Sequence, residues 1–259
     1  NYIMNKQFCF LVSLPRAGNT LLGSLLNQNP NICLTPNSIL IDVLWELHLL
    51  KDKKVFKNFP NTRSYDNIVK NVFNNYYDDF TASTIIDRGM WGTPSNLEQI
   101  KMNVTKAPKF IVLYRPVREC LASFVKANES LNMPEEPLMD YYLHDEGMIG
   151  RSLYSMQNLI SQHEDILFIT YKSLVTEPKQ TVKKICNFLG ERYVSIRTNN
   201  LDQLTINGVT YDDSILDVPL HEVHSNIVNE QIDVENYLSS HAIQTTNNLD
   251  NIEKLLRFH

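Results

Sequence analysis

A chain of 259 residues can form one large domain with a sizeable core, and 43% hydrophobic with 20% charged residues is typical of a globular protein. The net charge of −5 argues against nucleic acids and anionic polymers as main partners. We find no apolar run of membrane-spanning length and no signal peptide before the first predicted strand, so no membrane association is expected. The four scattered cysteines form no metal-binding spacing and favour a reducing, cytoplasmic compartment. The oligomeric state is left open.

Short apolar runs alternate with helical patterns along most of the chain. Strands are predicted at 8–14, 83–86, 110–114 and 166–170. Helices are predicted at 20–28, 38–50, 66–77, 93–101, 116–128, 137–163 and 178–189. This alternation predicts an α/β fold: a three-layer sandwich with a central parallel sheet flanked by helices.

The domain prediction is a single unit over residues 1–259, with a core at about 8–191 that contains the alternating strands and helices. The segment 192–259 is rich in Asn, Asp and Thr and has only short apolar clusters. It either covers the bound cofactor or forms irregular surface, and the pattern does not distinguish the two.

The segment FCFLVSLPRAGNT, residues 8–20, carries the most functional information. It predicts a strand, a tight loop and the start of a helix, so that free backbone N–H groups converge where an anion is favoured. Arg16 adds a guanidinium group to this loop. A Walker loop, as in P-loop NTPases, would require Gly at Ser13 and Lys at Asn19, whereas Gly18 and Thr20 fit its pattern. The loop therefore has the architecture of a phosphate site without the lysine of ordinary ATPases and kinases.

A second segment, FIVLYRPVRECLASFVK at 110–126, repeats the order of strand, turn and helix. Arg115 stands at the carboxyl end of the apolar strand, where open α/β sheets bind ligands. Ser123 follows about two helical turns later. A guanidinium and a hydroxyl suit a dianionic phosphate. Without the first segment, a surface charge and a solvated serine would be the simpler interpretation.

Together these segments resemble the sulfotransferases that use 3′-phosphoadenosine 5′-phosphosulfate (PAPS). In that family a Pro-Arg/Lys-Ser-Gly-Thr-Thr loop holds the 5′-phosphosulfate, and a later Arg and Ser bind the 3′-phosphate. A third match, FITYKSLVTEPKQTVKKICNFLGE at 168–191, resembles the strand and Pro-started helix beside the adenine. The cofactor-binding residues that this resemblance implies are Arg16, Ala17, Gly18, Asn19, Thr20, Arg115, Ser123 and Tyr171.

The resemblance implies a transferase that moves a sulfuryl group from PAPS to a hydroxyl, or less often an amine, of a small molecule, sugar or peptide. The product is adenosine 3′,5′-bisphosphate (PAP), and no metal is expected. Arg16 would stabilise the leaving 5′-phosphate, and Arg88, in STIIDRGMWG, would contact the sulfuryl group or pair with Asp87. The alternatives are a P-loop-like nucleotide kinase or NTPase, and a catalytically silent nucleotide-binding member of the family.

The general base is not at either position where the family carries one, because Asn37 and Met90 stand there. Asp87 is the first candidate in its place, although a neighbouring Arg88 would lower its pKa. The acceptor could also carry its own acidic group. Other candidates that the fold could bring to the site are Asp42, Glu46, His48, His144, His221 and His224.

Overall fold

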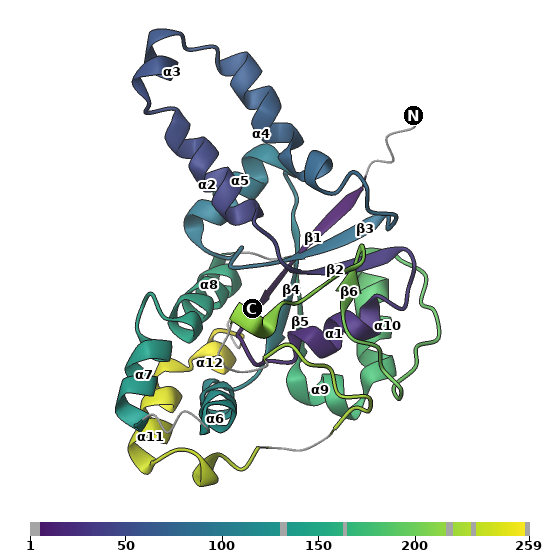
Figure 1. Cartoon of the computed structure of the whole chain (residues 1–259), viewed down its shortest axis with the longest axis vertical. Coiled ribbons are helices and arrows are strands. Elements are labelled where there is room, and N and C mark those ends of the chain that lie inside the picture. Colours follow the sequence, from purple (N-terminus) through teal and green to yellow (C-terminus); the bar gives the residue numbers. More distant parts are fainter. Residues whose placement is uncertain (1–5, 130–133, 163–164, 216–219, 229–231, 257–259) are drawn as a thin grey trace.

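The computed structural model describes residues 6–129, 134–162, 165–215, 220–228 and 232–256. Its centre is a five-stranded sheet in the order β2-β3-β1-β4-β5, in which all neighbouring strands are parallel. The strands are β1 (Gln7–Ser13), β2 (Ile32–Asn37), β3 (Thr84–Arg88), β4 (Lys109–Tyr114) and β5 (Ile166–Thr170). Helices lie on both faces of the sheet (Figure 1), which confirms the predicted α/β sandwich.

The four predicted strands are present, and β2 was missed. The apolar runs form strands because they are buried on both faces, as in β4, where Phe110 to Leu113 are 0% exposed. The sequence of β2, ICLTPN, contains a proline and ends in polar residues, which do not predict a strand. It forms one at the edge of the sheet, where a missing N–H is tolerated, with a register shift between Leu34 and Asn37.

The register brings the strand ends that carry chemistry to one edge of the sheet. Leu11 of β1 pairs with Arg88 of β3 on one side and with Ile111 of β4 on the other. Since the strands are parallel, the loops that follow β1, β3 and β4 all open at the same carboxyl edge.

The helices are α1 (Asn19–Leu26), α2 (Leu40–Leu50), α3 (Lys54–Asn58), α4 (Thr62–Tyr76), α5 (Pro94–Asn103), α6 (Val117–Ala127), α7 (Glu135–Leu143), α8 (Met148–Gln162), α9 (Tyr171–Thr176), α10 (Pro178–Leu189), α11 (Ser240–Leu249) and α12 (Ile252–Leu256). Helices α1 and α10 contact each other, while α8 packs against β1 and contacts α6, α7 and α12. Helices α2 and α4 extend away from the sheet with α3 between them (Figure 1). Across the described residues, we find no helix with both the length and the apolar character needed to cross a membrane.

The prediction of a single helix at 137–163 is wrong, because the chain turns between α7 and α8 and forms two helices. Residue 163 lies outside the described residues. Gly147 in this turn and Gly150 at the start of α8 have no room for a side chain. A Cβ at Gly147 would lie 2.6 Å from the carbonyl oxygen of Tyr142, and one at Gly150 would lie 2.1 Å from that of His144. Helical periodicity continues across the turn because both helices bury apolar faces.

The C-terminal segment crosses the carboxyl edge of the sheet. It contains a hairpin of β6 (Thr205–Ile206) and β7 (Val209–Thr210), the 3₁₀ turns η2 (Asp213–Ile215) and η3 (Val234–Asn236), and then α11 and α12. Helix α11 packs against α6, so the segment is anchored to the body that carries Ser123.

Candidate active site

The loop after β1 is built by left-handed backbone. Arg16 has φ 63° and Gly18 has φ 92°, and Gly18 caps α1 without a side-chain hydrogen bond. The first N–H groups of α1 are therefore available to a ligand at the pocket, where the helix dipole favours an anion.

Asn19 stands where a Walker loop has its lysine, and its side chain points into the protein. It is 5% exposed, and its amide Nδ2 donates to the carbonyl oxygen of Leu14 over 3.0 Å. Asn19 thus ties the loop together from inside, and no cation replaces the lysine at this position.

Arg115 connects three parts of the site from the end of β4. Its Nε donates to the Glu119 carboxylate over 3.1 Å and its terminal NH1 to the carbonyl oxygen of Arg16 over 2.9 Å. Its guanidinium also lies 4.2 Å from the centre of the Tyr171 ring. With only 7% of Arg115 exposed, these contacts fix the orientation of the group.

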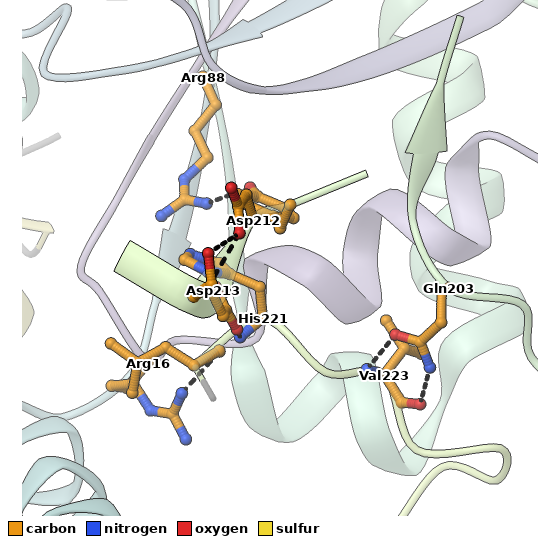
Figure 2. Close-up of polar contacts among 10 residues, drawn as sticks. Arg16, Arg88, Gln203, Asp212, Asp213, His221 and Val223 are labelled. Carbon is orange, nitrogen blue, oxygen red and sulfur yellow. Dashed lines mark hydrogen bonds and ion pairs between the residues drawn. The ribbon is translucent and has the colours of Figure 1, made fainter. Parts of the chain in front are cut away.

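Arg16 joins the same corner of the pocket. Its Nε donates to the Ser123 hydroxyl over 3.1 Å. Its NH1 donates to the carbonyl oxygen of Leu220 over 2.8 Å (Figure 2). Burial, and then the charge of Arg115, lower the pKa of Arg16. Among the described residues Arg16 has no carboxylate partner within ion-pair distance, so a bound anion would relieve the repulsion between the two cations.

Arg88 and Asp87 are neighbours in β3, and their side chains separate, as successive residues of a strand do. Arg88 reaches the pocket, where its NH1 donates to the Tyr211 hydroxyl over 3.3 Å and burial lowers the pKa of its guanidinium. Asp87 is 0% exposed and accepts hydrogen bonds from Tyr77, Ser38 and Trp91. Burial raises the pKa of Asp87 to about 6, although the three donors lower it in part.

One pocket of about 990 Å³ at the carboxyl edge of the sheet is lined by Arg16, Arg88, Arg115, Ser123 and Tyr171. It is large enough for a nucleotide together with a second substrate. The C-terminal segment supplies part of its wall, including Leu220, His221, His224 and Tyr237. Among the described residues, we find no group of three or more His, Cys, Asp or Glu side chains that could hold a metal ion.

Residues 9–195 match the family described as "Sulfotransferase family". This chain is a member of the sulfotransferase family. The match spans more than half of the chain and includes both loops that carry Arg16 and Arg115. A comparison with curated proteins finds no matching relative.

Solved structures with the same fold include other sulfotransferases. The sulfotransferase domain from the curacin biosynthetic pathway superposes with a TM-score of 0.60 at 17% identity, covering 94% of this chain and 97% of that one. The sulfotransferase domain of the Synechococcus PCC 7002 olefin synthase gives 0.58 at 18% identity, covering 94% of each chain. Mouse sulfotransferase SULT7A1, solved in complex with PAP, gives 0.56 at 15% identity, covering 98% of this chain and 90% of that one.

In this sulfotransferase the predicted site residues meet at one pocket, with two exceptions. The residues on the pocket wall are Arg16, Gly18, Asn19, Thr20, Arg88, Arg115, Ser123 and Tyr171. Ala17 has a fully buried side chain, so it can offer only its backbone to a ligand. Asp87 is buried among its donors and is not on the wall, which argues against its expected role as the base.

The candidates for the general base differ in whether they lie on the pocket wall. Asn37 is on the pocket wall, whereas Met90, Asp42, Glu46, His48 and His144 are not. Of the sequence candidates, His221 and His224 are on it.

Sequence reasoning missed Glu119, Tyr211 and Asp213, which contact the predicted residues. Glu119 could have been predicted, because it follows Arg115 by four positions, the spacing at which an acidic and a basic side chain pair on a helix. Tyr211 and Asp213 had no such signal, because they come from a segment without regular periodicity.

Proposed function

We propose that this sulfotransferase uses PAPS as its donor and transfers the sulfuryl group to an acceptor hydroxyl. The observation that carries this proposal is the cluster of Arg16, Arg115 and Ser123 around the N-terminus of α1. Two fixed guanidinium groups and a hydroxyl at one corner of the pocket suit a nucleotide with a second phosphate away from its 5′ end.

The residues have distinct roles in this proposal. Arg115 and Ser123 hold the 3′-phosphate, and Tyr171 lies beside the adenine. The backbone from Ala17 to Thr20, together with Arg16, binds the 5′-phosphosulfate. Arg88 faces the sulfuryl group from β3. The donor supplies the activated sulfuryl group, and these residues position it and stabilise the charge on the leaving phosphate.

We also propose that residues 1–259 act as one domain, because the C-terminal segment contributes to the same pocket as the core. Arg16 donates to Leu220, and Arg88 to Tyr211, so the catalytic arginines contact this segment directly. The four cysteines are free, as expected for the reducing, cytoplasmic location that we propose.

Isothermal titration calorimetry with PAP and with ADP, each with and without Mg²⁺, tests the donor class. We expect PAP to bind at least about tenfold more tightly than ADP, and its affinity to be independent of Mg²⁺. A preference for ADP or a requirement for Mg²⁺ would instead support the nucleotide kinase alternative. The buried Asn19 argues against that alternative, because it stands where a kinase loop has its lysine.

Replacing Gly18 by alanine tests the contact between the loop and Tyr171. Alanine at φ 92° is strained by roughly 1–2 kcal/mol, and its Cβ would lie 2.8 Å from the Tyr171 ring. We expect both a lower melting temperature and a roughly tenfold loss of PAP affinity, measured by calorimetry.

Gly208→Ala is the matched control, because Gly208 has φ 77° in the β6–β7 hairpin and its Cβ would meet nothing within 4 Å. It should lose similar stability and keep its PAP affinity. An equal loss of affinity in the two variants would mean that strain, rather than the displacement of Tyr171, causes the effect.

A further inference from the structure

His221 and Asp213 form a hydrogen-bonded pair on the pocket side of the C-terminal segment. The imidazole Nδ1 lies 2.6 Å from Asp213 Oδ1, and the backbone N–H of His221 donates to Asp213 Oδ2 over 2.9 Å (Figure 2). One carboxylate therefore holds both the ring and the backbone of the same residue. The side chains of His221 and Asp213 are 24% and 22% exposed, and His221 is on the pocket wall.

The pair determines which nitrogen of His221 can accept a proton. A carboxylate only accepts hydrogen bonds, so Nδ1 must carry the hydrogen that Asp213 receives. The lone pair of neutral His221 is then on Nε2, for which the described residues provide no hydrogen-bond donor. The imidazole is thus arranged as a proton acceptor.

Tyr211 holds the His221 ring close to Arg88. The two rings stack with their centres 3.8 Å apart and an angle of 2° between their planes. The hydroxyl of Tyr211 accepts from Arg88 over 3.3 Å. His221 therefore lies one ring away from the arginine that we propose to face the sulfuryl group.

The backbone on either side of His221 is also held. The preceding residue, Leu220, accepts from Arg16 of the phosphate loop. Two positions after His221, the side-chain amide of Gln203 forms two hydrogen bonds with the backbone of Val223, of 2.7 and 2.9 Å (Figure 2). The ring is positioned from both directions along the chain.

We propose that His221 is the general base of the transfer reaction, with Asp213 and Tyr211 as its positioning residues; this inference rests on the proposed function. His221 Nε2 takes the proton of the acceptor O–H as the acceptor oxygen forms its bond to sulfur. The bond between sulfur and the 5′-phosphate oxygen breaks, and its electron pair leaves with PAP. His221 then returns the proton to solvent.

The other candidates lack this arrangement. Asp87 is 0% exposed, and its oxygens are engaged by buried donors. His224 is on the pocket wall but forms no ion pair with a carboxylate among the described residues. Asn37 is on the wall and cannot act as a base.

Three variants test the proposal. His221→Gln removes the base, Asp213→Asn removes the carboxylate that orients it, and His241→Gln is the control, since His241 is exposed on α11 away from the pocket. Each is measured for PAP affinity by calorimetry and for release of sulfate from PAPS. Water serves as the acceptor in the second assay, so that no specific acceptor needs to be known.

We expect His221→Gln to keep PAP affinity within about twofold and to lose roughly 10²-fold or more in turnover. Asp213→Asn should lose less, and the acidic limb of its pH–rate profile should shift. The charged or titratable groups around His221 are Asp213, Tyr211, Arg88, Arg16, Glu222 and His224, so the profile is compared with that of His241→Gln. In ¹⁵N NMR spectra of the wild-type protein, neutral His221 should carry its proton on Nδ1.

The outcomes separate this inference from the proposed function. If PAP binds and His221→Gln turns over PAPS like the wild-type protein, His221 is not the base while the donor assignment stands. A proton on Nε2 of neutral His221 would also overturn the inference. If PAP binds and even the wild-type protein releases no sulfate, water is not an acceptor for this enzyme, and the position of the proton on neutral His221 in the NMR spectrum decides whether the inference is kept. If PAP does not bind, the proposed function itself fails.

Discussion

Replacing Arg115 by alanine is expected to lower the affinity for PAP about 100-fold and to leave the affinity for 5′-AMP within about threefold. The two nucleotides differ by the 3′-phosphate that we assign to Arg115 and Ser123. A fixed guanidinium with little exposure forms strong charge-assisted hydrogen bonds to a phosphate dianion, worth about 2–3 kcal/mol in total. Calorimetric titration of both nucleotides into both proteins measures the difference.

Arg118→Ala is the matched control on the same helix. Arg118 is exposed and donates to Asn247 over 2.9 Å rather than facing the pocket. Its removal takes away one positive charge and should leave both affinities unchanged. Arg115 also supports the loop, because it donates to the carbonyl oxygen of Arg16. The comparison of the two nucleotides detects a disturbance of the whole site. In that case PAP and 5′-AMP would lose affinity equally, and the 3′-phosphate assignment would be rejected.

In Asp87→Asn, the free energy of unfolding is expected to lose the decrease that the wild-type protein shows as the pH rises. Burial raises the pKa of Asp87 from 3.8 to about 6, so the folded protein holds this proton more tightly than the unfolded chain. The resulting stabilisation is present below the unfolded pKa and is lost as the pH rises through the folded one. Between about pH 4.5 and 7, the free energy of unfolding of the wild-type protein should fall by about 2 kcal/mol relative to Asp87→Asn.

Asparagine preserves most of the hydrogen bonds around this position. Its oxygen can accept from Ser38 and Trp91 as Asp87 Oδ1 does, and its amide can donate to the Tyr77 hydroxyl in the reverse direction. Urea denaturation at several pH values measures the difference. Asp79→Asn, at an exposed position, should follow the wild-type pH dependence. Parallel curves for all three proteins would show that Asp87 is not perturbed by burial.

The sequence alone determined the parts of the molecule that depend on neighbouring residues. The strand, loop and helix around Arg16 and Gly18 form one continuous segment, and so do the strand and helix that carry Arg115 and Ser123. In each, an apolar run followed by turn residues defines the local structure. Parallel strands with the same polarity then bring both segments to one edge of the sheet. This is why the family, and most of the side chains that line the pocket, could be found from the sequence.

Only the tertiary structure decided which side chains lie on the pocket wall. Asp87 and Arg88 are adjacent in sequence, yet one is enclosed by Tyr77, Ser38 and Trp91 and the other reaches the pocket. Asp213 and His221 are eight residues apart in a segment without periodicity, and their pairing depends on how that segment crosses the sheet. A side chain's burial and hydrogen-bond partners depend on residues far away in the chain, and local sequence patterns do not contain that information.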